Sequence, residues 1–272
     1  MLRSMYSGVS GMRGFQTKLD VIGNNIANVN TIGFKAGRVM FKDIMSQTVS
    51  GVTAPTDGAQ GGVNAKQIGL GVSIGSIDNM HLAGSAMTTN NPTDLRIDGD
   101  GFFLVKLSDA QETPFLTRAG DFHVDAGGNL LTSDGLHVVD SGGAVIQLEA
   151  GVTGFSISND GTLIQSMSDG TTVPGVQIGI GKVTNPQGLE KIGGNLYRMT
   201  LNANTDGALE PTTANNTETG TGAIVAGQLE MSNVDLTNEF TEMIVAQRGF
   251  QANSRIITTS DEVLQEVVNL KR

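Results

Sequence analysis

The sequence predicts an α+β fold, with long amphipathic helices at both ends that pair in a coiled-coil-like terminal domain and an antiparallel β domain between them. Two observations predict this arrangement. Apolar residues recur at three- and four-residue spacing near both termini, which is typical of amphipathic helices. In the middle, short alternating apolar runs are separated by Asp-Gly and Gly-Gly pairs about every seven to ten residues, as in antiparallel strands joined by tight turns.

The first helix is expected to begin at Leu2, because apolar residues keep helical spacing from there for about four heptads. These residues are Leu2, Met5, Val9, Met12, Leu19, Ile22, Ile26 and Val29. Asn28, Asn30 and Gly33 are expected to end the helix, since Asn and Gly accept the left-handed conformation needed at a helix C-terminus.

The second helix is expected to open at Ser232, where a hydroxyl three residues before the carboxylate of Asp235 forms a capping-box pattern, and to end near Arg272. Its apolar positions are Phe240, Met243, Phe250, Ile257 and Leu264, with Ile256, Val263, Val267 and Leu270 on an adjoining stripe. Both terminal stripes are wider than one partner helix would cover. We therefore expect a self-assembly interface made of Leu2, Val9, Leu19, Ile22, Ile26, Phe240, Met243, Phe250, Ile257 and Leu264.

The predicted organisation has three parts. Residues 1–30 and 232–272 form the discontinuous helical domain, residues 31–68 a linker region, and residues 69–231 the β-rich outer domain. Within the linker, residues 46–66 contain few large apolar side chains and are expected to be a flexible connector.

Composition excludes several kinds of site. The 272 residues include no Cys, which removes disulfides, thiolate metal sites and cysteine nucleophiles. A net charge of −10, no Trp and only 2 Tyr argue against nucleic acid as a partner. The 37 glycines are assigned to turns. With no long apolar run and no apolar signal-peptide core, the chain is expected neither to be embedded in a membrane nor to carry a cleavable signal.

One motif points to catalysis. Residues 71–75, GVSIG, match the G-x-S-x-G elbow of hydrolases, in which Ser73 would be the nucleophile. Apolar residues alternate straight through the motif, however, as in a strand, whereas an elbow needs a sharp turn into a helix. The histidines, His81, His123 and His137, are too dispersed for a zinc site. No catalytic, metal or cofactor site is expected, and a Ser73-dependent hydrolase remains a remote alternative.

Five segments resemble the bacterial flagellar rod and hook protein family. Residues 19–35, LDVIGNNIANVNTIGFK, are similar to its N-terminal signature, and residues 232–272 to its C-terminal one. Residues 94–103, 117–122 and 188–197 resemble its outer β domain. The signature positions are Asn24, Asn25, Asn28, Gly33, Phe34 and Lys35, the last three of which would begin the linker.

The resemblance implies a non-enzymatic subunit of a tube built from many copies, with the terminal helices around a central channel. The ending VNLKR favours the flagellar hook, a universal joint that transmits torque from rod to filament. The alternative is the distal rod, a straight drive shaft, since hook subunits of enteric bacteria are longer.

Further partners follow from the resemblance alone: rod proteins, hook-filament junction proteins, the hook cap and the flagellar export apparatus. The chain would lie in the extracellular hook or the hook-basal body after export without a cleaved signal. Phe41 and Met45 resemble the family's export recognition motif.

Overall fold

The computed structural model describes residues 2–55, 61–109, 111–149, 151–204 and 209–270. It divides the chain into two compact units. The helical unit consists of Met1–Ala27, Gly37–Asn79 and Asp235–Arg272, and the β unit of Asn28–Ala36 and Met80–Val234. These bounds differ from the expected ones, because residues 37–68, expected as a linker, and residues 69–79, expected in the β domain, belong to the helical unit.

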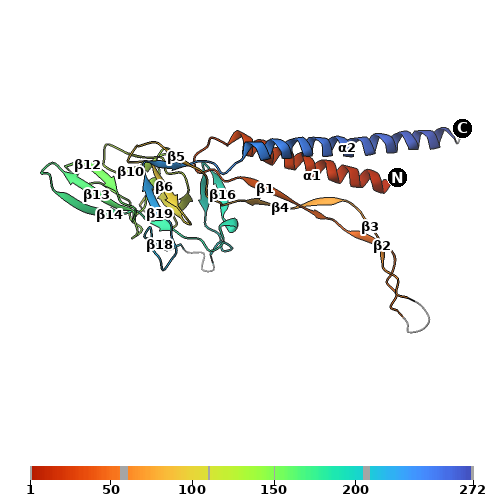
Figure 1. The fold of residues 1–272 in the computed structure, drawn as a ribbon, viewed down its shortest axis with the longest axis horizontal. Helices are drawn as coiled ribbons and strands as arrows, with labels where there is room; N and C mark the ends of the chain where they lie inside the picture. Colours follow the sequence, from red (N-terminus) through yellow and green to blue (C-terminus); the bar gives the residue numbers. More distant parts are fainter. Residues whose placement is uncertain (1, 56–60, 110, 150, 205–208, 271–272) are drawn as a thin grey trace. The chain divides into compact units, whose positions relative to one another are not determined.

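Two long helices form the frame of the helical unit (Figure 1). Helix α1 spans Leu2–Ala27 and α2 spans Leu236–Asn269, so the predicted helices and the α+β class are confirmed. The expected capping box is wrong: Asp235 itself is the N-cap and accepts a hydrogen bond from the Thr237 N–H at 2.9 Å. The predicted end at Arg272 lies outside the described residues.

A two-stranded antiparallel ribbon completes the helical unit. Strand β1 (Gly37–Asp43) pairs with β4 (Val72–Asn79), with an irregularity between Met40 and Phe41. Farther along, β2 (Ser46–Ser50) pairs with β3 (Lys66–Gly69). The segment expected as a flexible connector therefore begins and ends in paired strands.

The β unit is built from short antiparallel strands and one 3-10 turn, η1 (Pro186–Gly188). The strands are β5 (Ala86–Thr88), β6 (Leu95–Asp98), β7 (Phe102–Lys106), β8 (Phe115–Thr117), β9 (Phe122–Val124), β10 (Leu130–Thr132), β11 (His137–Val138), β12 (Val152–Ile157), β13 (Thr162–Met167), β14 (Thr172–Gln177), β15 (Ile180–Gly181), β16 (Glu190–Gly193), β17 (Leu196–Arg198), β18 (Pro211–Thr212), β19 (Ala223–Ala226) and β20 (Gln228–Glu230). The largest sheet has the order β16-β17-β8-β7-β11-β10-β9, with β15 joining β7 to β18. Strands β12, β13 and β14 form a separate sheet, and β19 pairs with β6 and β20 with β5.

Strand β7 lies at the centre of this unit, because all five of its residues are buried. Successive side chains of a strand point to opposite faces. Accordingly, Phe103 and Val105 belong to one apolar cluster, while Phe102 and Leu104 belong to a second. Strand β7 therefore lies between the two apolar clusters of the β unit and contributes one face to each.

Candidate assembly interface

Helices α1 and α2 run side by side in opposite directions (Figure 1). They approach closely where one of them carries glycine. A Cβ on Gly11 would lie 2.7 Å from the side-chain nitrogen of Asn253, and a Cβ on Gly249 would lie 2.6 Å from the ring of Phe15. The prediction that the glycines belong to turns is wrong at these positions, where small residues let the two backbones come together.

Polar contacts fix the two helices near the other end of the pair. Lys18 forms an ion pair with Glu242. Asn25, which is buried, donates its amide hydrogens to the Gly37 carbonyl at 2.9 Å and to Glu239 at 3.0 Å, and accepts from the Gly37 N–H at 3.0 Å. Partial burial raises the pKa of Glu239, and the hydrogen bond from Asn25 opposes that rise. A signature asparagine thus joins α1 to β1 and to the first turn of α2.

The side chains predicted to mediate assembly differ in exposure. Ile22 is buried. Val9, Leu19, Ile26, Met243, Ile257 and Leu264 are half-buried. Phe240 and Phe250 remain 50% and 37% exposed. The side chain of Leu2 lies outside the described part of the chain.

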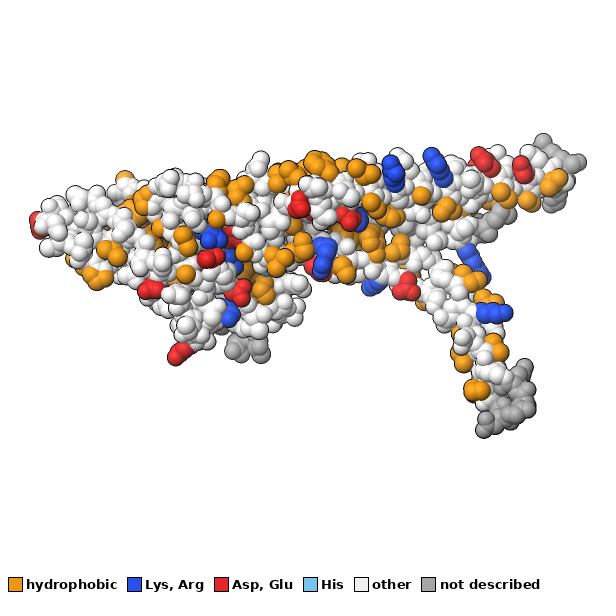
Figure 2. All heavy atoms as spheres, viewed as in Figure 1, with side chains coloured by type: hydrophobic (Ala, Val, Ile, Leu, Met, Phe, Trp, Pro, Cys, Tyr) orange, Lys and Arg blue, Asp and Glu red, His pale blue; other side chains and the backbone are white. Residues whose placement is uncertain are grey.

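Helix α2 keeps an extensive apolar surface open to solvent (Figure 2). This surface, called here the α2 apolar surface, consists of Leu236, Phe240, Ile244, Val245, Phe250, Ile256, Val263, Val267, Val268 and Leu270, which are 37 to 86% exposed. Isolated exposed apolar residues are ordinary, whereas ten along a single helix favour binding to another molecule.

Gly33, Phe34 and Lys35 begin no exposed linker, because all three are buried in the β unit. Gly33 has a φ of 68°, and its N–H donates to the Glu230 carbonyl at 2.8 Å. A Cβ on Gly33 would lie 2.5 Å from the backbone nitrogen of Ala119. Both the backbone conformation and the lack of space therefore require glycine there.

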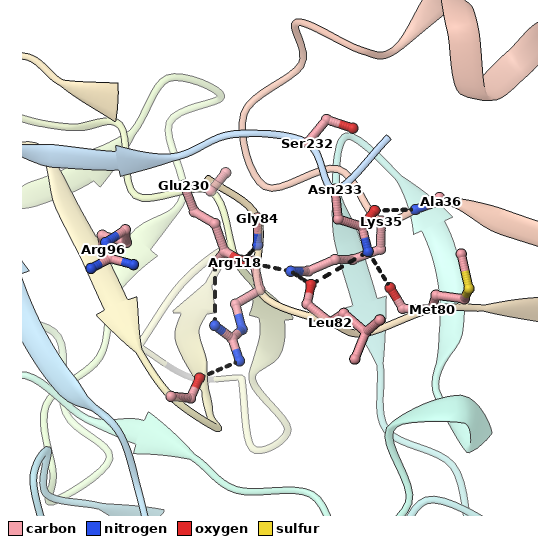
Figure 3. A network of polar contacts seen from close by, with 12 residues as sticks. Lys35, Ala36, Met80, Leu82, Gly84, Arg96, Arg118, Glu230, Ser232 and Asn233 are labelled. Carbon is pink, nitrogen blue, oxygen red and sulfur yellow. Dashed lines mark hydrogen bonds and ion pairs between the residues drawn. The ribbon is translucent and has the colours of Figure 1, made fainter. Parts of the chain in front are cut away.

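Lys35 belongs to a buried cluster of three charges, the 35–118–230 cluster (Figure 3). Its ammonium lies 2.6 Å from one oxygen of Glu230 and donates to the Leu82 carbonyl at 2.7 Å. Arg118 donates to the other oxygen of Glu230 at 3.2 Å and to the Gly99 carbonyl at 2.9 Å. The Lys35 and Glu230 side chains are each 1% exposed and that of Arg118 is 5% exposed.

The electrostatics of this cluster favour an ionised Glu230. Burial acts to raise the pKa of Glu230, but the positive charges of Arg118 and Lys35 outweigh it, and the pKa is lowered. Burial lowers the pKa of Lys35 by more than the neighbouring carboxylate raises it. Glu230 is therefore the group that holds the two cations inside the β unit.

A second set of contacts gathers around Asn233 (Figure 3). Its side-chain oxygen accepts from the Ala36 N–H at 2.8 Å, and its amide donates to the Met80 carbonyl at 2.7 Å. The Met80 N–H in turn donates to the Ala36 carbonyl at 2.8 Å. Neither Asn233 nor Glu230 was predicted as a site residue. Asn233 lies within the C-terminal signature, and Glu230 follows apolar Leu229 in a strand.

The other signature and export positions lie in less constrained places. Asn24 is exposed, and Asn28 accepts from the N–H and the hydroxyl of Thr31 in the turn that follows α1. Phe41 is 37% exposed and its ring lies 5.9 Å from that of Phe15, while Met45 is 64% exposed. The export role of Phe41 and Met45 stays a prediction.

The residue suggested for catalysis lies in a regular strand. Ser73 is within β4, where it pairs with Lys42 of β1, and the chain continues extended to Asn79. The turn into a helix that a nucleophile elbow needs is therefore missing at this position. Among the described residues, no group of three or more His, Asp or Glu side chains could hold a metal ion.

A cavity of about 690 Å³ lies in the β unit. Asp100 and Glu210 line it together with Arg118 and Lys182, so the formal charges of its described lining balance. Burial lowers the pKa of His81, which also lines this cavity, to about 4, so its imidazole is neutral at pH 7. Within the described residues, no helix is both long and apolar enough to span a bilayer.

Comparison with known proteins identifies the family. The model described as "Flagella basal body rod protein" matches residues 5–35, "Flagellar hook protein FlgE/F/G D1 domain" matches residues 96–165, and "Flagellar basal body rod FlgEFG protein C-terminal" matches residues 225–270. The flagellar basal-body rod protein FlgG of Bacillus subtilis (strain 168) is 55% identical over 272 residues, which cover 100% of both chains.

Two further relatives come from Borreliella burgdorferi. The basal-body rod protein FlgG of that organism is 35% identical over 275 residues, and its hook protein FlgE is 28% identical over 450 residues, with 100% of each chain covered in both cases. Full-length similarity at this level is decisive for membership. The chain belongs to the family of bacterial flagellar rod and hook proteins.

Proposed function

We propose that this protein is a subunit of the flagellar rod, in which many copies assemble through α1 and α2 into a straight tube. A structural role in the flagellum follows from the family. The choice of rod over hook rests on length: rod relatives align with this chain over 272 and 275 positions, whereas the hook protein of Borreliella burgdorferi needs 450. The hook, favoured from the sequence alone, is thus less well supported than its alternative.

The α2 apolar surface is the observation that supports assembly. Its ten members are exposed in the single chain, and water would be released from them when copies pack together. Burial of apolar surface contributes about 25 cal/mol per Å². Because α1 covers one side of α2 only, the remaining apolar residues are available to neighbouring copies.

The proposed role requires no catalysis, and its partners are first of all copies of the same chain in the flagellar basal body. Contacts with other rod proteins, with junction and cap proteins and with the export apparatus remain predictions from the family. Recognition by the export apparatus through Phe41 and Met45 belongs to the same group of predictions.

Electron microscopy of the purified protein, after polymerisation is induced with ammonium sulfate, tests the proposal. Sulfate strengthens apolar burial because it is excluded from protein surfaces. Straight, rigid tubes are expected for a rod subunit. Curved or coiled tubes would favour the hook, and persistent monomers would contradict assembly through the helices.

A further inference from the structure

The outward face of α2 carries a line of charges whose sign changes along the helix. Arg248, Arg255, Glu262 and Glu266 follow one another at intervals of seven, seven and four residues, which keeps them on one side of a helix. All four side chains are exposed. Figure 2 shows the basic groups of the helix followed by acidic groups toward its C-terminal end.

These charges lie on the side of α2 that faces away from α1. Ala246 is completely buried, and Asn253 contacts Gly11 of α1. Arg248 and Arg255 each follow one of these residues by two positions, which is about 200° around the helix. Within the described residues, the ion pairs include none of the four charges. In the part of the chain that the structure describes, the line therefore has no ion-pair partner.

Apolar residues lie beside this line. Ile256, Val263, Val267 and Leu270 follow one another at intervals of seven, four and three residues and form a neighbouring stripe that is 42 to 86% exposed. A surface that combines exposed apolar residues with uncompensated charges of both signs fits a partner with the same combination. A second copy of α2 offers this combination, provided that its charges are shifted relative to the first.

We propose that neighbouring copies pack their α2 helices in parallel with an axial shift that places Arg248 and Arg255 of one copy beside Glu262 and Glu266 of the next. The inference rests on the proposed function, because an open polymer repeats one head-to-tail contact between equivalent copies. Glu266 follows Arg255 by 11 residues and Glu262 follows Arg248 by 14. At 1.5 Å per residue, the shift is roughly 16 to 21 Å.

Electrostatics select this shift. Copies in exact lateral alignment would bring arginine beside arginine and glutamate beside glutamate, which costs free energy. The shifted contact brings opposite charges together and leaves the apolar stripe to pack between the helices. An antiparallel pair also matches the charges, but it closes into a dimer and cannot extend into a tube.

Charge reversal tests the shift. The variant Arg248→Glu/Arg255→Glu makes the line wholly acidic, and the variant Glu262→Arg/Glu266→Arg makes it wholly basic. Each alone is expected to raise the critical concentration for polymerisation about tenfold, as expected when several ion pairs are replaced by repulsions. An equimolar mixture of the two, or the quadruple variant that carries both sets, is expected to polymerise like the wild type.

Polymerisation is induced with sucrose rather than salt, because sucrose strengthens burial without screening charges. The control variant is Asp109→Arg/Glu112→Arg, on exposed positions of the β unit. This variant raises the net charge of −10 by the same amount as Glu262→Arg/Glu266→Arg does, because each replaces two acidic residues by arginine. It is expected to assemble normally. Normal assembly of both reversed variants, while the wild type also forms tubes, overturns the shift and leaves the proposed function intact.

Disulfide trapping gives an independent measurement, since the natural chain contains no Cys. Mixed Arg255→Cys and Glu266→Cys copies are expected to cross-link under oxidation, whereas each variant alone is not. Cross-linking of Arg255→Cys with itself would show copies in alignment and overturn the shift. If the wild type assembles no further than closed dimers, or remains monomeric under all conditions, the proposed function is overturned together with the shift.

Discussion

Lys35, Arg118 and Glu230 place two positive charges and one negative charge out of contact with water inside the β unit. The excess positive charge is compensated by backbone oxygens, because Lys35 also donates to Leu82 and Arg118 to Gly99. Buried ion pairs contribute little net stability compared with apolar residues of the same shape, but the loss of one partner is costly.

Replacement of Glu230 by Gln is therefore expected to destabilise the β unit by about 3–5 kcal/mol, since two buried cations lose their anion. Urea unfolding of the wild type and the variant, followed by circular dichroism, measures the difference. The matched control is Glu190→Gln. Glu190 pairs with Arg198 on the surface, with side chains 53% and 60% exposed, and its loss should cost less than about 1 kcal/mol.

The wild type and Glu230→Gln should also differ in how their stability depends on pH. The pKa of Glu230 in the folded chain lies below its ordinary value of 4.5, so the unfolded chain takes up its proton first as the pH falls. The stability that Glu230 contributes is complete above pH 4.5 and disappears as the pH drops through the folded-state pKa. The difference between wild type and Glu230→Gln should thus be largest at pH 7 and shrink toward pH 3. A difference that does not depend on pH would show that the carboxylate charge is not involved.

Sequence reasoning reached only part of this cluster. Lys35 and Gly33 belong to a recognisable family signature, but the resemblance to the family placed them at the start of a linker. Their partner Glu230 lies 195 residues away along the chain. Hydrophobic periodicity reports which side of an element is buried, and it carries no information on which distant charge will neutralise a buried lysine.

At the scale of whole elements, the two helices could be predicted well and their contact could not. Three-four spacing of apolar residues indicated both helices. In α1, however, the buried positions that face α2 include Gly8 and Gly11, whereas the predicted residues Val9 and Leu19 are only half-buried. A search for large apolar residues overlooks a contact surface made of glycine.

The pairing of β2 with β3 was missed for a related reason, whereas the strand through Ser73 was predicted and is β4. Residues 46–66 contain few large side chains, so they lack the alternating pattern that predicts strands. Their pairing relies on main-chain hydrogen bonds, which the sequence does not display.

Gly249 provides a test of the helix contact. In an exposed helix, Gly→Ala stabilises by roughly 0.5–1 kcal/mol. At Gly249 the new methyl group would meet the ring of Phe15, whose other neighbours include Phe41. We expect Gly249→Ala to destabilise the helix pair by about 1–3 kcal/mol, as overpacked cores do.

Thermal unfolding of the monomer, monitored at the helical circular dichroism band, measures this effect. Gly23→Ala is the control, because no atom lies within 4 Å of a Cβ at Gly23, and this variant should be stabilised. Combination of Gly249→Ala with Phe15→Leu should restore stability. If Gly249→Ala instead stabilises the protein as Gly23→Ala does, the close approach at Phe15 is wrong.

For the whole molecule, the division into two units separates assembly from the fold of the β unit. Phe250 lies in the helical unit and is 37% exposed, so Phe250→Asp adds a charge that is tolerated in the monomer but buried in a tube. We expect this variant to lose polymerisation while it keeps the strand signal in circular dichroism.

Leu201→Asp is the matched control, because Leu201 is 81% exposed in the β unit, and it should polymerise normally. Loss of the strand signal in Phe250→Asp would contradict the separation of the two roles. Equal loss of assembly in both variants would show that solubility, rather than the helical surface, controls polymerisation.

The chain passes between its two units at four points, and three of them meet at Asn233. The amide of this residue bonds to Ala36 and to Met80, and it stands one residue before the last residue of the β unit. Tension that reaches the β unit along any one of these segments is therefore shared among all three at a single side chain. In a subunit that carries torque, the force on the β unit would thereby be distributed over three connecting segments instead of acting on a single segment of backbone.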